Sequence, residues 1–197
     1  DSQRRRLQRF VQRQVALETF FAGWTRSVLK ALRGEPVVLV VDETKIEARL
    51  GMMVVGVVYE GRCIPLAWRG YRANSHSDYP AEGQVGMILS LLRQVRAGMK
   101  AGTRVRVLAD RGIGTSPDLM RGIMDLGWYF LFRVTKQSKL VLPNGDAVCF
   151  ADQVQQPGEY YADSGWVFKK RGHVPAYVRV LWGDHARERW ALVTNDP

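Results

Sequence analysis

The sequence predicts an α/β fold, in which a mixed, partly antiparallel sheet has flanking helices and a β-rich insertion. Two patterns indicate this fold. Short runs of β-branched and aromatic residues between turn residues are typical of strands, and apolar residues at every third or fourth position are typical of amphipathic helices. Hydrophobic residues make up 46% of the 197 residues, so the chain can bury a sizeable core, which excludes a globally disordered protein.

A basic helical segment is predicted at residues 1–35. From residue 17 onward, apolar side chains recur at three- and four-residue steps, and Gly34 and Pro36 end the helix. The segment carries eight Lys or Arg residues and three acidic residues, which accounts for half of the formal net charge of +10. The stretch at residues 3–14 is rich in Arg and Gln, and its sequence fits a DNA-facing helix and a solvated helix equally well.

The core of the fold is predicted at residues 36–134. A continuous apolar, β-branched run, such as the one from Val37 to Val41, suits a strand buried on both faces. The turn residues Glu60 and Gly61 join the second and third runs into a hairpin. Five strands are predicted, at residues 37–41, 52–59, 62–68, 104–109 and 128–134.

Two helices are predicted between these strands. The first begins near Pro80, because proline fits a first helical turn, and ends before Gly102. The second begins at Ser116 and Pro117, where serine can cap the helix and proline can occupy its first position. The resulting order is three strands with a hairpin, then helix, strand, helix and strand.

The remainder of the chain has a different pattern. Residues 135–190 contain short β-like runs, a turn signal at residues 143–146 and no convincing helix, so we expect a β-rich insertion. Residues 191–197 are expected to return to the core as its last strand.

Two acidic residues follow predicted core strands. Asp42 comes after the run that ends at Val41, and Asp110 comes after the run that ends at Ala109. In an open α/β sheet, the crevice beyond the strand ends is a common site position. Two neighbouring carboxylates repel each other unless a cation lies between them, and hard oxygen ligands suit Mg²⁺ or Mn²⁺. Taken alone, each acid could instead form a turn or cap a helix.

The segments around these acids carry a family resemblance. Val-Val-Asp42-Glu43-Thr44 and Leu-Ala-Asp110-Arg111-Gly112 resemble the first and second acidic motifs of the DDE transposases of bacterial insertion sequences. The nearest branch has a β-strand insertion before its final Glu. The stretch Trp-Ala-Leu-Val-Thr-Asn at residues 190–195 resembles that branch's strand after the insertion. The resemblance covers most of the chain from residue 37 and implies a ribonuclease-H-like sheet, with which the predicted element order agrees.

The resemblance implies a function. Asp42 and Asp110 would be two of three ligands for Mg²⁺ or Mn²⁺, used for cleavage of double-stranded DNA at transposon ends and strand transfer into target DNA by a homodimer. The family's third acid is a Glu on a helix after the last strand. We expect that Glu beyond Pro197, and hence a truncated and inactive fragment. Glu159 and Glu188 lie in the insertion and lack the context of this third acid.

Several nearby side chains have two interpretations. Glu43 could support a metal ligand, but we expect it to point away into solvent. Arg111 could hold a phosphate or the carboxylates, or form an ordinary salt bridge. Thr44 and Lys45 could contact backbone phosphates, although a plain strand extension is the default.

Two further candidates lie away from the acids. The basic run at residues 169–171, near Trp166 and Tyr177, could grip DNA or be a solvated hairpin tip. Ser116 is interpreted as a helix cap rather than a nucleophile, because no nearby His could act as its base.

Composition limits the class of protein. The net charge of +10 favours a nucleic-acid partner over basic residues that serve solubility alone. Cys63 and Cys149 are too few for a disulfide framework, and the scattered positions of His76, His173 and His185 argue against a structural zinc site. No apolar run could span a bilayer and no signal peptide pattern is present, so we expect a cytoplasmic protein.

Two other functions remain open. The chain could be an inactive nucleic-acid-binding remnant or regulator that keeps the fold without catalysis. It could also be another ribonuclease-H-like nuclease, acting on RNA or on a DNA junction. A preference for duplex DNA ends over RNA hybrids would separate the transposase from such a nuclease.

Overall fold

The computed structural model describes residues 17–32, 36–47, 49–73, 79–168 and 172–197. The described strands form one sheet in the order β3-β2-β1-β4-β5-β10-β9-β8-β6-β7. The β1–β4 and β4–β5 pairs are parallel, and the other neighbouring pairs are antiparallel. The prediction of a mixed α/β fold is therefore confirmed, although the sheet is larger and more antiparallel than expected.

The first three strands form an antiparallel meander: β1 (Val37–Ile46), β2 (Leu50–Tyr59) and β3 (Arg62–Arg72). The prediction that the first strand ends at Val41 is wrong. The ladder between β1 and β2 continues from Val41 opposite Val55 to Ile46 opposite Leu50, because β2 supplies hydrogen-bonding partners along the whole length of β1. Asp42 is therefore a residue within a strand rather than the first residue after one.

The centre of the sheet is built from β4 (Val105–Ala109), β5 (Tyr129–Val134) and β10 (Trp190–Thr194). β10 lies between β5 and the insertion strand β9 and is antiparallel to both. β4 and β5 begin one residue later than predicted and end where predicted. β10 begins at Trp190 and ends at Thr194, whereas the last strand was expected in residues 191–197. Short apolar runs bounded by turn residues were sufficient to locate them.

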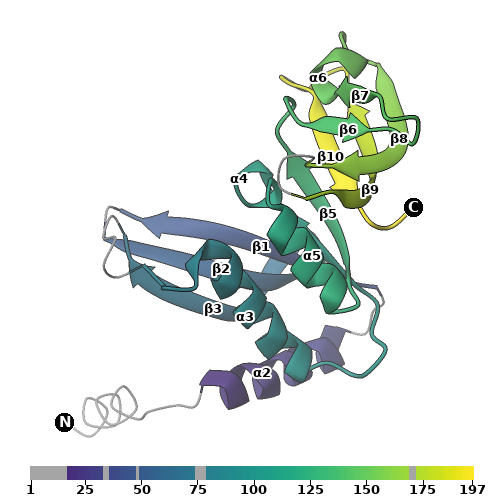
Figure 1. Ribbon diagram of the computed structural model, residues 1–197. Coiled ribbons are helices and arrows are strands. Elements are labelled where there is room, and N and C mark those ends of the chain that lie inside the picture. The colour runs from purple at the N-terminus through teal and green to yellow at the C-terminus, as the bar shows by residue number, and fades with distance from the viewer. Residues whose placement is uncertain (1–16, 33–35, 48, 74–78, 169–171) are drawn as a thin grey trace, which may run out of the picture.

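Four helices of the described chain cover one face of the β1–β5 part of the sheet (Figure 1). They are α2 (Leu17–Leu32), α3 (Gly83–Ala97), α4 (Arg111–Gly114) and α5 (Pro117–Asp125). The Ser116 hydroxyl accepts a hydrogen bond from the Leu119 amide at 3.3 Å, which confirms the predicted cap. α3 starts later than predicted, at Gly83 rather than near Pro80.

The two faces of the central strands differ in burial. Leu39, Val107 and Phe130 are fully buried on the face that packs against α3 and α5. The alternate residues of the same strands point to the opposite face, as the pleat requires, and these side chains are only half-buried. The core thus lies on one side of the sheet, and the other side is where a polar side chain of β1 or β4 can reach solvent.

The segment predicted as an insertion, residues 135–190, contributes the outer strands of the same sheet. Its elements are β6 (Lys139–Val141), β7 (Ala147–Cys149), α6 (Phe150–Gln153), β8 (Tyr160–Val167) and β9 (Val174–Leu181). The expected β-rich texture is confirmed, and the expectation of no helix is wrong by the one turn of α6. The division of the chain into segments 1–35, 36–134, 135–190 and 191–197 stays a prediction.

Some expectations fall outside the described residues. The Arg- and Gln-rich stretch at residues 3–14, the basic run at residues 169–171 and His76 are among them. None of the helices in the described part of the chain is long and apolar enough to cross a membrane.

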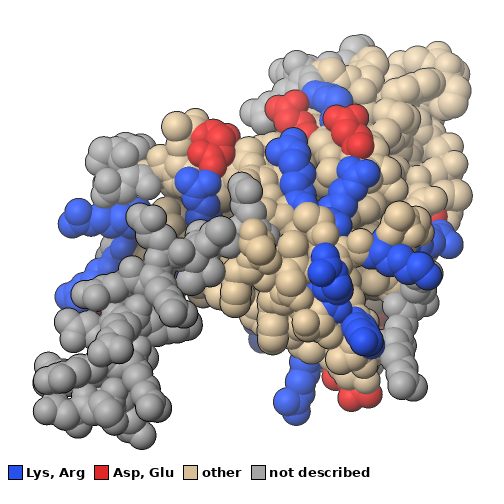
Figure 2. All heavy atoms as spheres, turned by 90° about the horizontal axis from the view of Figure 1, so that it is seen from below, with Lys and Arg blue, Asp and Glu red and all other residues tan. Residues whose placement is uncertain are grey.

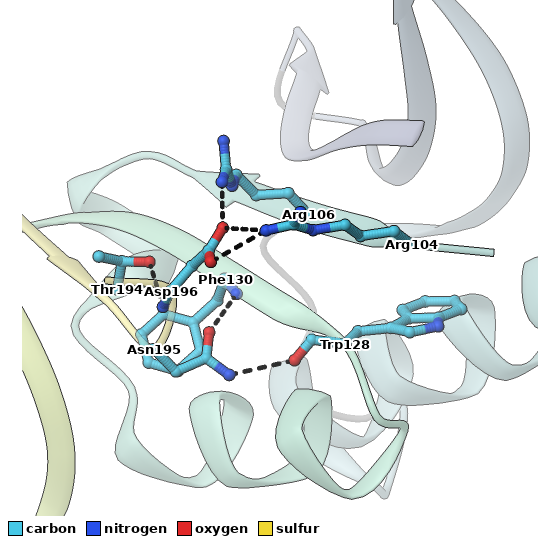
Figure 3. A network of polar contacts seen from close by, with 7 residues as sticks. All are labelled: Arg104, Arg106, Trp128, Phe130, Thr194, Asn195 and Asp196. Carbon is cyan, nitrogen blue, oxygen red and sulfur yellow. Dashed lines mark hydrogen bonds and ion pairs between the residues drawn. The ribbon is translucent and has the colours of Figure 1, made fainter. Parts of the chain in front are cut away.

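A polar network fastens the end of β10 to the start of β4 and β5 (Figure 3). The Asn195 side chain accepts a hydrogen bond from the Phe130 amide at 2.8 Å and donates one to the Trp128 carbonyl at 3.2 Å. Asp196, only 9% exposed, forms ion pairs with Arg104 at 3.2 Å and with Arg106. These contacts give residues 194–196 a structural role, because they hold the end of β10 against the starts of β4 and β5.

We expect the Asp196→Asn substitution to destabilise the fold in a pH-dependent way. Hydrogen bonds and charge from Arg106, and then from Arg104, hold the pKa of the Asp196 carboxyl below its ordinary value of 3.8. Since this pKa is lowered by folding, the stabilisation is present above 3.8 and is lost as the pH falls through the lowered value. Charge-assisted bonds to half-exposed partners predict a loss on the order of 1–2 kcal/mol near neutral pH.

Urea unfolding at several pH values measures this effect. The difference between the wild type and Asp196→Asn should shrink in acid, whereas the exposed control Asp125→Asn should show little difference at any pH. An equal loss of stability across the whole pH range would show that the charge of Asp196 is not what holds β10.

Candidate functional site

The register of β1 and β4 determines where the two predicted acids lie. Val41 is paired with Ala109 in the parallel ladder, so Asp42 and Asp110 are the next residue along each of two neighbouring strands. Val41 and Ala109 both face the buried side, so the following residue of each chain lies towards the opposite, half-open side. Asp42 and Asp110 are both exposed. The structure therefore brings the two acids to the same edge of the sheet.

Asp42 sits at the point where β1 leaves β4 and continues only with β2. Its partner across the antiparallel ladder is Val54, and its carboxylate accepts a hydrogen bond from the Thr44 hydroxyl at 3.3 Å. Thr44 lies two residues along the same strand and hence on the same face. Its default interpretation as part of a longer strand is confirmed, and its hydroxyl also orients the neighbouring acid.

Asp110 has a structural task at the end of β4. Its Oδ1 accepts hydrogen bonds from the backbone amides of Gly112 at 3.0 Å and Ile113 at 3.2 Å, so it caps the short helix α4. The capping alternative considered for this residue is therefore real. A carboxylate has a second oxygen, and capping through Oδ1 holds the side chain in a fixed orientation in which Oδ2 can serve as a ligand.

Glu43 does not point into solvent, as the sequence analysis expected. Neighbouring strand residues face opposite sides of the sheet, so Glu43 turns towards the helices. Its carboxylate accepts hydrogen bonds from the Tyr71 hydroxyl and from the Gln84 amide, the latter at 2.9 Å. Burial, and then this hydrogen bond, raise the pKa of Tyr71. Glu43 thus stabilises the contact between β1, β3 and α3.

Arg111 takes part in an ion-pair cluster with residues of β5 and the insertion. Glu188 pairs through Oε2 with Arg111 at 3.6 Å and through Oε1 with Arg133. The Arg133 guanidinium lies over the Trp190 ring, 4.7 Å from its centroid. Sequence reasoning left the salt bridge as one of two roles for Arg111, and it did not connect Arg133 or Trp190 with Arg111. Their distance along the chain from Arg111 gave no local signal.

Cys63 of β3 is a further residue that the sequence did not connect with Asp42. Its sulfur packs against Gly56 of β2, and Gly56 lies opposite Val40 in β1. Burial, and then the Asp42 carboxylate, raise the pKa of the Cys63 thiol. The pKa of this thiol therefore depends in part on the charge of Asp42.

The two acids fit a hard divalent cation only as a partial ligand set. Among the described residues, no group of three or more His, Cys, Asp or Glu side chains is placed to hold a metal ion. Mg²⁺ commonly binds through one or two carboxylates and completes its shell with water and substrate phosphate oxygens. Asp42 and Asp110 match that pattern, and they do not match a closed site built from protein ligands alone.

Two cavities of the described chain lie away from the acids. One of about 640 Å³ opens at the amino ends of β4 and β5 and is lined by side chains that include Arg96, Lys100, Arg104, Trp128 and Tyr129. Asp110 follows the carboxyl end of β4, and Asp42 lies within β1 just past its last pair with β4, so this cavity is not their site. The surface seen from below Figure 1 carries more basic than acidic side chains (Figure 2).

Comparisons with known proteins give limited information. No protein-family model matches the chain, and no curated protein matches it either. A crystal structure of endonuclease V from Bacillus subtilis matches with 11% identity and a TM-score of 0.40, covering 92% of this chain and 77% of that one. Endonuclease V from Streptomyces avermitilis matches with 13% identity and a TM-score of 0.35, covering 87% and 78%. Scores this low do not establish a shared fold.

The resemblance to DDE transposases is corrected by these findings. No transposase family model or curated transposase matches, and the two solved structures just described are endonucleases. The motif residues also have structural explanations: Asp110 caps α4, and Asn195 fastens β10 to β5. Transposon-end cleavage and strand transfer rested on the resemblance alone and are withdrawn with it. The homodimer and a third acid beyond Pro197 stay predictions.

We expect the reactivity of Cys63 to report the charge of Asp42. In a Cys149→Ala background, alkylation by iodoacetamide depends on the thiolate form of Cys63. Because the Asp42 carboxylate disfavours the thiolate, Asp42→Asn should shift the pH of half-maximal alkylation downward. Burial, the larger cause of the raised pKa, remains in the variant, so the shift should be partial. The control Asp125→Asn should leave the pH profile of alkylation unchanged. If Asp42→Asn gave the same profile as the wild type, the placement of the Asp42 carboxylate near the Cys63 thiol would be contradicted.

Proposed function

We propose that this protein is a metal-dependent nuclease with a ribonuclease-H-like core, in which Asp42 and Asp110 hold Mg²⁺ or Mn²⁺. The observation that carries the proposal is the pairing of Val41 with Ala109, which presents one carboxylate from each of two parallel central strands at one edge of the sheet. Two carboxylates at adjacent positions repel each other, which favours a bound cation between them.

The strand order supports the proposed core. The first five strands run β3-β2-β1-β4-β5, with an antiparallel meander followed by parallel β1, β4 and β5. The helices α3 and α5 connect these strands and cover one face. We take residues 36–134 as this core and residues 135–190 as an insertion that extends the sheet.

A divalent ion bound by the two acids would activate water and stabilise negative charge on the oxygens of the scissile phosphate. The chain's own residues would position it. The backbone amides of α4 fix Asp110, and the Thr44 hydroxyl orients Asp42. The reaction would be hydrolysis: water adds to phosphorus, one P–O ester bond breaks, and the products are a hydroxyl end and a phosphate end.

The partner would be nucleic acid. The formal net charge of +10 suits a polyanion, and basic side chains adjoin the candidate site at Arg111 and Arg133. Phosphate contacts of this kind give affinity without sequence specificity. A cleavage assay distinguishes duplex DNA, RNA and an RNA–DNA hybrid as the substrate.

A second candidate is a nucleic-acid-binding protein that keeps the fold without catalysis. The observation that favours it is the capping role of Asp110, since a helix cap alone would explain an acid at this position. The two functions differ in what happens when the charge of Asp110 is removed while its capping ability is kept. Asn caps helices about as well as Asp does.

Calorimetric titration with Mn²⁺ tests the metal site. The wild type should bind Mn²⁺, and Asp42→Asn and Asp110→Asn should each lose at least about tenfold in affinity, or roughly 1.4 kcal/mol, because half of the carboxylate ligands are gone. The control Asp125→Asn removes an exposed acid at the carboxyl end of α5 and should bind like the wild type. Equal Mn²⁺ binding by all four proteins would contradict the proposed ligands.

A cleavage assay on labelled duplex DNA, single-stranded RNA and an RNA–DNA hybrid then separates the two candidate functions. Strand cleavage by the wild type with Mg²⁺ that is lost in Asp110→Asn, a variant that still folds and binds nucleic acid, supports the nuclease. Binding of nucleic acid without cleavage of any substrate would favour the second candidate.

A further inference from the structure

The Arg111–Glu188–Arg133 cluster has the arrangement of a phosphate site with a carboxylate in the phosphate's place. The two oxygens of Glu188 engage two different guanidinium groups, one from α4 and one from β5. A phosphodiester likewise offers two charged oxygens that arginine recognises through paired donors. Lys136 also contributes to the positive potential, since Arg133, then Arg111 and Lys136 lower the pKa of Glu188. Two guanidinium groups thus contact the Glu188 carboxylate, and the Lys136 charge adds to their effect.

The cluster lies at the same edge of the sheet as the candidate metal ligands. Leu108 is paired with Leu131 in the parallel ladder between β4 and β5. Asp110 and Arg133 each lie two residues further along, on the same face and at the same level. Arg111 is the residue next to Asp110. A phosphate bound between these arginines would therefore be adjacent to the acids at which hydrolysis is proposed.

The accessibility of the three side chains differs in a way that suits exchange of one anion for another. The Arg133 side chain is 24% exposed and is held against the Trp190 ring. The side chains of Arg111 and Glu188 are 51% and 45% exposed. One arginine is thus fixed in place, whereas the carboxylate that it binds is open to solvent. An ion pair exposed to this degree contributes little to stability, so its displacement by a ligand costs little.

We propose that Arg111 and Arg133 bind a backbone phosphate of the nucleic-acid substrate, and that Glu188 is an internal competitor that occupies this phosphate position when no nucleic acid is bound. The inference rests on the proposed function, and it adds a regulatory element to it: the wild-type affinity for nucleic acid is set below what the arginines alone would give. Glu188 is a positioning residue for these arginines and takes no part in hydrolysis.

Fluorescence anisotropy with a short labelled DNA duplex, in buffer with EDTA, tests the inference. Glu188→Gln should bind the duplex about three- to tenfold more tightly than the wild type, because both arginines become available. Arg133→Gln should bind more weakly and should reduce the slope of log affinity against log salt concentration by about one phosphate contact.

Glu82→Gln is the matched control. Glu82 forms a comparable exposed ion pair with Arg69, so its substitution changes the net charge by the same amount and also frees an arginine. It lies before α3, away from the cluster. If Glu82→Gln tightens binding as much as Glu188→Gln, the effect is general electrostatics and the inference fails. The inference also fails if Glu188→Gln binds the duplex with the same affinity as the wild type. This includes the case in which Glu188→Gln binds inorganic phosphate more tightly than the wild type but does not bind the duplex more tightly.

Measurement in EDTA keeps the inference separate from the metal site. Tighter binding by Glu188→Gln together with an absence of cleavage in Mg²⁺ would retain the phosphate site and reject the nuclease. Cleavage by the wild type together with no change in Glu188→Gln would retain the nuclease and reject the competitor. Thermal unfolding of each variant confirms that the comparison is between folded proteins.

Discussion

The parallel pairing of β1 with β4 sets the position of the candidate site, because it matches Val41 with Ala109 and brings the following acid of each strand to one edge of the sheet. Burial fixes this register. Leu39, Val41 and Val107 are buried on the helix-covered face, and a slip by one residue would turn these apolar side chains out towards solvent. The acids are thus held in place by hydrophobic side chains that take no part in chemistry.

Much of this arrangement could be predicted from the sequence, because it depends on local patterns. The apolar runs identified the central strands, and Ser116 with Pro117 identified the start of α5. The prediction failed where partners distant in sequence decide the outcome. β1 continues through Asp42 to Ile46 because β2 pairs with it. Glu43 faces the helices, where Tyr71 and Gln84 donate hydrogen bonds to its carboxylate.

The family resemblance failed for a related physical reason. An Asp followed by two residues with free backbone amides is what a helix cap after a strand requires, and Asp110 satisfies that requirement. The same short motif therefore arises from architecture as well as from catalysis. The Arg111–Glu188–Arg133 cluster had no comparable signal, since Glu188 is 55 residues from Arg133. Only the fold brings these charges to the edge where the two acids lie.

Diffraction from crystals of the protein soaked in Mn²⁺ tests the central claim most directly. Anomalous scattering locates manganese without reference to activity or to substrate. We expect a peak that is coordinated by the carboxylates of both Asp42 and Asp110 and that disappears in Asp110→Asn crystals. A well-occupied peak elsewhere on the protein, with none between these two side chains, would contradict it.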